Sequence, residues 1–490
     1  MSNRPEEYPN RESRPLGASE HGVVQSSKRR CKPMGSPTDL SVVWEGSQFI
    51  THSLAIVNRE LCSELIERGI DLGIRLYEEH EFDAGNDPKL KKLQARFGAA
   101  PSSPTQVHVR HQWPPSFVRP EQGKWVMIQP WEYGFILKSW LAPMREHVDE
   151  IWVPSRFVRQ CYIDSGLDPR KVFVIPNGVD VQRFSPQAQP ALLQTQKSFK
   201  FLFVGGTIPR KGIRLLLDTY RKTFTKNDDV CLVIKDMGSK GVYRGSTSRD
   251  EIELMMSDPH APEIEYIDQH LCHEQVAGLY TAADVLVHPY HGEGFGMPIA
   301  ESMACGRPAI VTGLGAATDF CNQENAYLIQ ATRHDMPTSK VSDEEACGFP
   351  WIANPDPDSL SSLMRDAVEN PARRQKKGIA ARQTIVEEFT WEQAVDMVQI
   401  RLEVLAQDSQ SPETMGVSNS QWAHLGLSAL KRALCSDPKN AALVCEIVGR
   451  LRQDGKIDEA AEILALSIAR MPGQPDLKKY LRILSTEIGR

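Results

Sequence analysis

Two carboxylates and three closely spaced glycines make the segment 291–301 the part of the chain best equipped for chemistry. Glycines let a ligand approach the backbone, and free N–H groups at the start of a helix attract an anion because the helix dipole is positive there. Carboxylates are poor partners for phosphate, but Glu293 and Glu301 can accept hydrogen bonds from hydroxyls. The segment therefore predicts a ligand with both a phosphate and a sugar. The N–H groups expected to hold the anion are those of Gly294, Phe295 and Gly296.

This segment should lie between the C-terminal end of a buried strand and the N-terminus of a helix. The strand is expected to end at His288, Pro298 should occupy the first helical position, and Gly306 should end the helix. That placement puts Glu301 in the first helical turn. The alternative is that Glu293 and Glu301 only satisfy N–H groups at the helix start.

Two adjacent cations, Arg210 and Lys211, form a second candidate group. They follow an expected strand over 200–204 and a glycine turn, and they directly precede an expected helix over 212–224. The alternative interpretation is a solvated pair of basic side chains in a loop.

Three further candidates follow expected strands in the first part of the chain. Gly46 comes directly after the first strand, His111 follows a run that ends at Arg110, and Glu132 follows a run that ends at Gln129. Ligands of open α/β sheets bind outside the carboxyl ends of the strands, so His111 and Glu132 should both face a cleft. The sequence does not decide which of the two residues has a catalytic role. A histidine beside tryptophans is as often structural as catalytic.

Short β-branched runs alternate with amphipathic stretches along most of the chain, which is the pattern of parallel sheets with helices on both faces. A polar segment rich in turn residues, 177–198, separates two such series. We therefore expect an α/β fold with two doubly wound, Rossmann-like domains, 41–176 and 199–385, and a cleft between them. The expected strands are 42–44, 106–110, 124–129, 150–153, 171–175, 200–204, 230–234, 264–267, 284–288 and 308–311, and the expected helices are 50–68, 155–166, 212–224, 273–282 and 298–305.

The two ends of the chain differ from this pattern. Residues 1–40 are rich in Pro, Ser, Arg and Glu without apolar periodicity, and we expect them to be disordered. Residues 418–490 are expected to be helical, and Pro438 and Pro472 lie 34 residues apart, as in a tetratricopeptide repeat. One and a half repeats cannot stand alone, so this tail should dock on the second domain or on another subunit.

The composition is that of an ordinary soluble protein, with 41% apolar and 24% charged residues. A formal charge of -6 gives no overall attraction to nucleic acid or to an anionic membrane. The ten cysteines have no CxxC spacing and are expected to be reduced thiols. No apolar stretch approaches the roughly 20 residues that span a bilayer, and no secretory signal is recognisable, so a cytoplasmic location is expected.

The motif Gly-Glu-Gly-Phe-Gly-Met-Pro-Ile-Ala-Glu-Ser-Met-Ala-Cys-Gly-Arg-Pro, residues 292–308, resembles the signature of retaining glycosyltransferases of the GT-B fold, in family four. The resemblance extends over about residues 41–406. It is supported by the Arg-Lys-Gly element that ends at Gly212 and by Val-Ile-Pro-Asn-Gly-Val-Asp over 174–180. It also implies that a helix starting near Thr390 and covering 386–410 crosses back to the first domain.

The resemblance assigns roles to most of the candidate residues. Relatives commonly place a histidine after a strand of the first domain, and His111 and Glu132 compete for that role. Glu293 would contact the hydroxyls of the donor sugar, Glu301 the ribose, and Arg210 and Lys211 the pyrophosphate, whose charge grows in the transition state. Gly46 would belong to the glycine loop that lets the acceptor domain approach the donor. Many relatives carry one more arginine where this chain has Gly-Gly-Thr over 205–207, which leaves Arg210 and Lys211 as the cations.

We therefore expect a retaining transfer of sugar from a nucleotide sugar to an acceptor hydroxyl, without metal or other cofactor. The acceptor would be a glycan, a lipid-linked sugar or a protein, and the C-terminal helices could bind a protein partner or a second chain. The alternatives are a scaffold with a degenerate catalytic half, and a GT-B sugar phosphorylase or epimerase. Neither the sugar nor the nucleotide is identified.

Overall fold

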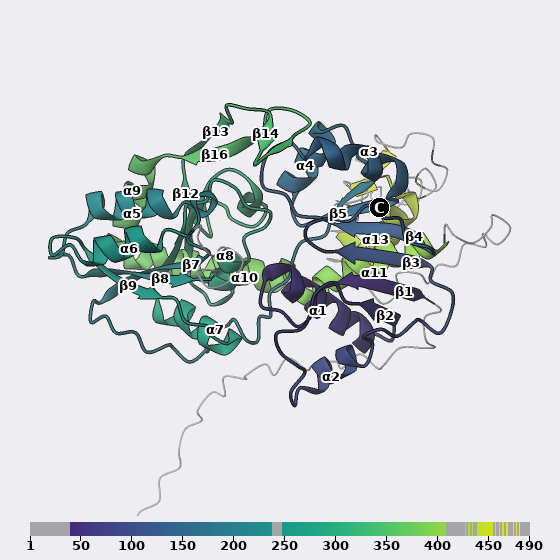
Figure 1. The fold of residues 1–490 in the computed structure, drawn as a ribbon, viewed down its shortest axis with the longest axis horizontal. Helices are drawn as coiled ribbons and strands as arrows, with labels where there is room; N and C mark the ends of the chain where they lie inside the picture. Colours follow the sequence, from purple (N-terminus) through teal and green to yellow (C-terminus); the bar gives the residue numbers. More distant parts are fainter. Residues whose placement is uncertain are drawn as a thin grey trace, which may run out of the picture. The chain divides into compact units, whose positions relative to one another are not determined.

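Two parallel six-stranded sheets form the framework of the chain (Figure 1). The computed structural model describes residues 40–237, 247–407 and 439–453, with single positions between 427 and 480. The predicted disordered segment 1–40 lies outside the described residues except for Leu40, and much of the predicted helical tail does too. The expected fold class is confirmed.

The first sheet has the strand order β2-β1-β3-β4-β5-β6, with every neighbouring pair parallel. Its strands are almost entirely buried because helices cover both faces. The strands are β1 (Ser41–Gly46), β2 (Asp71–Arg75), β3 (Val107–His111), β4 (Lys124–Ile128), β5 (Glu150–Val153) and β6 (Val172–Val174).

The second sheet has the order β12-β11-β10-β7-β8-β9 and is also parallel throughout. The order reverses at β7 and β10, and ligands of doubly wound sheets bind at such a switch point. The strands are β7 (Phe199–Gly205), β8 (Val230–Asp236), β9 (Glu263–Ile267), β10 (Val285–His288), β11 (Ala309–Thr312) and β12 (Tyr327–Ile329).

The helices connect the strands and cover the sheets. Several begin with a side-chain cap; Ser155, for example, accepts a hydrogen bond from the Val158 N–H at the start of α4. The helices are α1 (Ser53–Glu67), α2 (Pro88–Gln94), α3 (Lys138–His147), α4 (Arg156–Asp164), α5 (Ile213–Thr223), α6 (Arg249–Met256), α7 (His273–Ala282), α8 (Met297–Ala304), α9 (Pro357–Glu369), α10 (Pro371–Glu388), α11 (Trp391–Gln407) and α13 (Ala441–Gln453), with short 3-10 turns η1 (Pro209–Lys211) and η2 (Ala316–Asp319).

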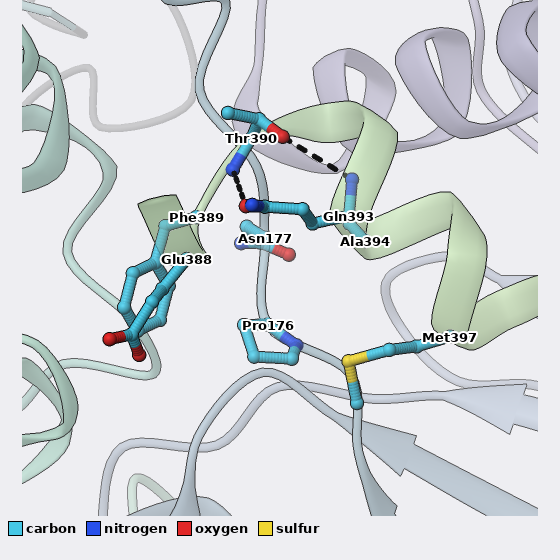
Figure 2. A pocket seen from close by; sticks show the side chains of 8 residues that line it. All are labelled: Pro176, Asn177, Glu388, Phe389, Thr390, Gln393, Ala394 and Met397. Atoms are coloured by element: carbon cyan, nitrogen blue, oxygen red, sulfur yellow. Dashed lines mark hydrogen bonds between the residues drawn. The ribbon is translucent and has the colours of Figure 1, made fainter. Parts of the chain in front are cut away.

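The chain passes between the two sheets twice, and the two passages touch. The first follows β6 through Pro176, and the second joins α10 to α11. Val179 forms a parallel bridge with Thr390, and its N–H donates to the Phe389 carbonyl at 2.8 Å. Figure 2 shows the small pocket beside this double crossing, where the Gln393 side chain and Thr390 cap the start of α11.

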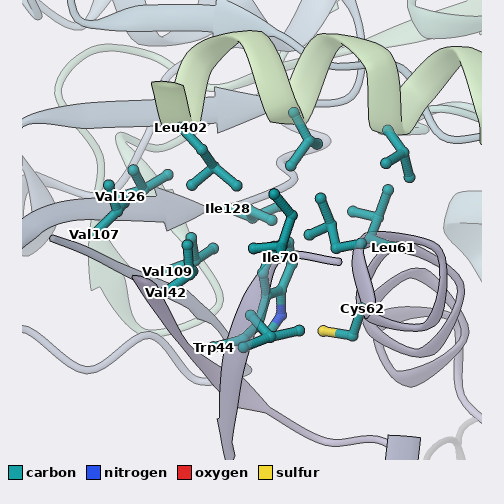
Figure 3. Packing of buried hydrophobic residues seen from close by; sticks show 14 of the residues in the cluster. Val42, Trp44, Leu61, Cys62, Ile70, Val107, Val109, Val126, Ile128 and Leu402 are labelled. Carbon is teal, nitrogen blue, oxygen red and sulfur yellow. The ribbon is translucent and has the colours of Figure 1, made fainter. Parts of the chain in front are cut away.

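Helix α11 is part of the hydrophobic core of the first sheet. Its apolar residues share one buried cluster with β1, β3 and β4, and Leu402 lies over Val126 and Val107 in Figure 3. A buried ion pair adds to this attachment: the Arg401 guanidinium donates to both oxygens of Glu150 on β5, with Nε at 3.2 Å from Oε2. The same guanidinium stacks on the Phe173 ring at 3.9 Å. The last long helix of the described chain therefore belongs to the first sheet.

A second connection between the sheets is an arm of four short strands, residues 331–355. It contains β13 (Ala331–Asp335), β14 (Lys340–Val341), β15 (Glu344–Glu345) and β16 (Trp351–Pro355). The arm leaves the second sheet after β12 and contacts the segment that follows β4. The Cys347 N–H donates to the Ile136 carbonyl at 2.9 Å, and the Trp351 ring meets Phe157 of α4 edge to face at 5.5 Å.

The described part of the C-terminal region contacts α11. Ile400 shares a buried cluster with Leu443, Val444 and Ile447 of α13. These residues therefore contact a helix of the first sheet, whereas docking on the second domain or on another subunit was expected. The predicted tetratricopeptide repeat lies partly outside the described residues, so it stays a prediction.

All ten expected strands correspond to strands of the two sheets. The sequence missed β2, β12 and the arm, and it missed helices α2, α3, α6, α9 and α10. The first expected helix begins at Ser53 rather than near residue 50, because His52 caps it by accepting the Ala55 N–H. In the described residues, no helix is both long and apolar enough to cross a membrane.

Candidate active site

The glycine-rich segment lies after β10, as predicted, and leads into α8. Gly296 has φ of 100° and occupies the N-cap position, so the helix begins at Met297 and Pro298 is its second residue rather than its first. Within the described residues, no acceptor binds the N–H groups of Gly294, Phe295 or Gly296, and no side chain caps α8. These groups are available to an anion. The Phe295 ring belongs to the hydrophobic core and lies tilted against the Phe320 ring, with 5.1 Å between their centroids.

A buried ion pair joins the two most informative motifs. Lys211, the last residue of η1, donates from Nζ to Oε1 of Glu293. Only 13% of the Lys211 side chain and 7% of the Glu293 side chain are exposed. Burial works against ionisation of Glu293, but the positive charges of Lys211 and Arg210 outweigh it and hold the pKa of this carboxyl at about 2. Burial also lowers the pKa of Lys211, and the Glu293 carboxylate opposes that change.

Arg210 links this pair to the first sheet. Its Nη2 lies 3.4 Å from Oε1 of Glu132, its Nη1 lies 3.9 Å from Oε2 of Glu293, and Nη1 donates to the Gly292 carbonyl at 2.7 Å. Glu132 follows β4 in the first sheet, whereas the other three residues belong to the second. The structure therefore brings four predicted site residues together, and we call Glu132, Arg210, Lys211 and Glu293 the charge network.

His111 lies elsewhere, at the end of β3, and makes no hydrogen bond or ion pair with the charge network among the described residues. Its Nδ1 lies 2.8 Å from Oδ1 of Asn58, which also accepts from the Trp44 indole N–H at 2.9 Å. An indole nitrogen can only donate, so this Asn58 atom is an oxygen and His111 must donate to it from Nδ1. The Nε2 atom of His111 is therefore left as an acceptor. Burial, together with nearby His52, lowers the pKa of His111 to about 3, so the ring is neutral.

Gly46 pairs with His111 across β1 and β3, and its place is explained by packing. A Cβ atom at this position would come within 2.4 Å of the Asn58 Nδ2 atom and of the His111 carbonyl oxygen. Asn58 needs that space because its Nδ2 donates to the Ser47 and His111 carbonyls. A larger residue at 46 would therefore disturb the group that orients His111.

Glu301 is in the second turn of α8, not the first, because the helix begins at Met297. Its Oε2 accepts from the Tyr280 hydroxyl at 2.7 Å. Burial raises the pKa of Glu301 to about 7, against the opposing effects of this hydrogen bond and of Arg183. A small cavity beside it is lined by residues from both halves of the chain: Ile56, Glu60, Gly178, Val179, Asp180, Arg183, Phe184, His273, Met297, Glu301 and Trp391.

His288 was missed as a site residue. It ends β10, is fully buried, and neither of its ring nitrogens has a hydrogen-bond partner in the described structure. Its Nε2 lies 3.8 Å from Oε1 of Glu293, and its ring stacks on Phe203 at 5.4 Å. Burial lowers the pKa of His288 to about 4. The available signal was a titratable residue at the end of an otherwise apolar strand.

Each half of the chain contains a segment that matches a known protein family. Residues 198–342 match the family model Glycosyl transferases group 1, and residues 90–183 match Glycosyltransferase Family 4. Both halves of the chain therefore resemble glycosyltransferase domains. A curated relative, the MMP alpha-(1->4)-mannosyltransferase of Mycolicibacterium hassiacum, is 24% identical over 267 residues, which are 54% of this chain and 56% of the relative. The chain spans about a third to just over half of the length of the curated relatives it matches.

Solved structures show the same fold. A glycosyltransferase from Rickettsia africae is 14% identical, with a TM-score of 0.55 over 76% of this chain and 100% of that protein. The Anabaena protein HepE in complex with UDP-glucose is 12% identical, with a TM-score of 0.52 over 74% of this chain and all of HepE. Both sheets and their helices therefore form a GT-B fold.

The position of Lys211 depends on Gly212, which has φ of 77° and whose Cβ would lie 1.9 Å from the Pro289 carbonyl oxygen. We expect Gly212→Ala to lower the free energy of unfolding by about 3 kcal/mol or more, through backbone strain and this clash. Gly69→Ala is a matched control, because Gly69 has φ of 82° with no atom within 4 Å of its Cβ. It should lose only about 1–2 kcal/mol. Urea denaturation measures both, and equal losses would contradict the packing argument.

Proposed function

We propose that this protein is a retaining glycosyltransferase that moves a sugar from a nucleotide-sugar donor to an acceptor hydroxyl in the cleft between its two sheets. The observation that carries the proposal is the charge network beside the open N-terminus of α8. Two cations and a row of free N–H groups meet two carboxylates there, at the switch point of the second sheet. A diphosphate bearing a sugar needs that combination.

The diphosphate binds where Lys211, Arg210 and the N–H groups of residues 294–296 converge. Without donor, Lys211 is paired with Glu293, and Arg210 lies near both Glu132 and Glu293, so the buried charges are balanced. The incoming phosphate takes Glu293's place on Lys211. As the sugar leaves, charge grows on the phosphate, and cations fixed beside it stabilise that state more than the ground state.

Glu293, released from Lys211, accepts hydrogen bonds from hydroxyls of the donor sugar. The bond between the sugar C1 and the phosphate oxygen breaks, and the acceptor oxygen bonds to C1 on the same face of the ring. The acceptor proton passes to the departing phosphate oxygen, so the reaction needs no nucleophile from the protein. This is the retaining course that the family resemblance implies.

The two candidates in the first sheet take different roles. His111 presents a neutral Nε2 that can accept a hydrogen bond from a substrate hydroxyl, because Asn58 fixes its tautomer. Glu132 is a positioning residue that orients Arg210 across the cleft at 3.4 Å. This assignment separates the roles that the sequence left open.

Relatives suggest which donors to test first. HepE was solved with UDP-glucose, and a Corynebacterium glutamicum relative is a GDP-mannose-dependent mannosyltransferase. We therefore propose a UDP- or GDP-hexose as donor, with a glycan, a lipid-linked sugar or a protein as acceptor. Binding measured against a panel of UDP-, GDP- and ADP-sugars tests the proposal directly, and binding of none of them would refute it.

Lys211→Ala should lower turnover of the donor found in that panel by about 100-fold or more, because it removes a cation from the developing phosphate charge. Lys92→Ala is the control, since Lys92 is an exposed residue of α2 paired only with surface Glu67 at 2.9 Å. Initial rates of nucleotide release measure both variants. Parental turnover by Lys211→Ala would show that the donor site is assigned wrongly.

Transfer should not depend on a divalent metal, because Lys211 and Arg210 supply the positive charge that a metal would provide. We expect the same initial rate before and after treatment with EDTA. Complete loss of activity under chelation, restored by Mn²⁺, would contradict both the mechanism and the roles of the two cations.

Donor affinity should increase with pH through the titration of Glu301, which we propose binds the ribose hydroxyls. The ionised carboxylate is the better acceptor, and a pKa of about 7 means that its population rises about tenfold between pH 6 and pH 8. Calorimetry with UDP or GDP should therefore show up to about tenfold tighter binding at pH 8. Glu301→Gln is the control: the phosphates of UDP or GDP still titrate with this variant, but the carboxyl at position 301 is gone. Identical pH profiles for the two proteins would rule out this role.

A further inference from the structure

The loop after β3 holds a tryptophan out from the protein surface. Trp113 lies two residues beyond His111 and is 52% exposed, more than any other tryptophan in the described part of the chain. Two hydrogen bonds from Arg110 hold the loop in place: its Nη1 donates to the Ser116 carbonyl at 3.0 Å and to the Val118 carbonyl. The Arg110 guanidinium also stacks on the Trp125 ring at 5.0 Å. An ordered loop therefore presents an indole ring that it does not bury.

A row of three indoles runs from this exposed ring towards the charge network. Trp113 meets Trp140 edge to face at 5.8 Å, and Trp140 meets Trp131 edge to face at 4.9 Å. Trp131 is locked by its Nε1, which donates to two nearby carbonyls, and it directly precedes Glu132. We call Trp113, Trp140 and Trp131 the indole row. Its inner end is adjacent in sequence to the residue that contacts Arg210.

Two unpaired amides lie at the same edge of the sheet. Gln112 and Gln129 directly follow β3 and β4, and their exposed fractions are 6% and 1%. The register pairs Arg110 with Met127, and two steps further along it Gln112 stands opposite Gln129. Strand alternation puts both on the sheet face that carries Trp125 and Met127, the face covered by Trp140 and Trp131.

Neither carboxamide makes a side-chain hydrogen bond within the described structure, and the buried atoms left without a partner are Oε1 of Gln112 and Nε2 of Gln129. A buried polar atom without a partner costs free energy. One of these atoms is an acceptor and the other a donor. A hydroxyl group is the ligand that can satisfy both, because it donates and accepts at the same time.

We propose that Trp113, Gln112 and Gln129 form a binding subsite for an uncharged pyranose ring of the acceptor. The ring's C–H face stacks on the Trp113 indole, and a hydroxyl donates to Gln112 and accepts from Gln129. The subsite rests on the proposed function, because the indole row leads to the charge network where transfer would occur. Neutral amides and a neutral ring favour a saccharide over a phosphorylated ligand, whose binding would call for cations.

Binding of simple sugars tests the subsite without requiring the natural acceptor. The probes are methyl α-D-mannopyranoside, methyl α-D-glucopyranoside and methyl β-D-galactopyranoside, each added to the full chain with and without UDP or GDP. Saturation-transfer NMR and tryptophan fluorescence report binding. We expect Trp113→Ala to weaken binding about tenfold and Trp113→Phe to retain most of it, because stacking needs only an aromatic face. Gln129→Leu should weaken sugar binding, while the tryptophan fluorescence of the sugar-free protein should stay the same as in the parent.

Leu254→Ala is the matched control, since Leu254 is 75% exposed on α6 of the other sheet and should have no effect on sugar binding. Nucleotide affinity should be the same in all four variants, and in transfer assays only the KM for acceptor should rise in Trp113→Ala. Sugar binding that is absent, or that is equal in the parent and Trp113→Ala, overturns the subsite even where the nucleotide still binds. Trp113-dependent binding to phosphatidylcholine vesicles instead of sugars overturns it too. Failure of the parent to bind any nucleotide sugar, with Trp113-dependent sugar binding intact, overturns the proposed function and leaves the subsite.

Discussion

The site is organised by the need to balance two carboxylates with two cations away from bulk water. Glu293 is almost fully buried, and an isolated carboxylate there would be costly, so Lys211 and Arg210 must stand beside it. Arg210 also serves Glu132 on the other sheet. The same requirement therefore sets the conformation of the 209–212 turn, the path of the glycine-rich segment and the approach of the two sheets.

The framework meets this requirement through simple features of parallel sheets. In each sheet the carboxyl ends of the strands lie at one edge, so the residues after β3, β4, β7 and β10 gather at the edges where the chain's polar chemistry is found. Helix α11 then fixes the chain's return to the first sheet, through the core seen in Figure 3 and the Glu150–Arg401 ion pair. Apolar packing and one buried ion pair therefore hold α11 on the first sheet, while the charge network lies at the site.

The sequence predicted ten of the twelve strands of the two sheets, because apolar runs and glycine turns are local signals. The family resemblance, and not the local pattern, assigned Glu293, Lys211 and Arg210 to one donor. The sequence could not predict that Lys211 pairs with Glu293, nor that Arg210 reaches Glu132, since side chains 82 residues apart or in different sheets meet only through tertiary packing. His288 was not predicted as a site residue for a related reason, since its burial depends on strands β7 and β10 lying side by side. Strand β2 was missed because it carries only two apolar residues, Leu72 and Ile74, on either side of a glycine, which is a weak signal for a strand.

The arm over residues 331–355 has a mechanical consequence. The two sheets are joined at the double crossing near Val179 and again at the arm, where Cys347 contacts Ile136 and Trp351 contacts Phe157 of α4. Other contacts also link the two halves: Ser155 Oγ donates to the Gly294 carbonyl at 2.8 Å, and Arg210 lies 3.4 Å from Glu132. Rotation of one sheet relative to the other would have to break the contacts of the arm as well as these. The arm therefore restrains the relative motion of the two sheets at a place far from the double crossing.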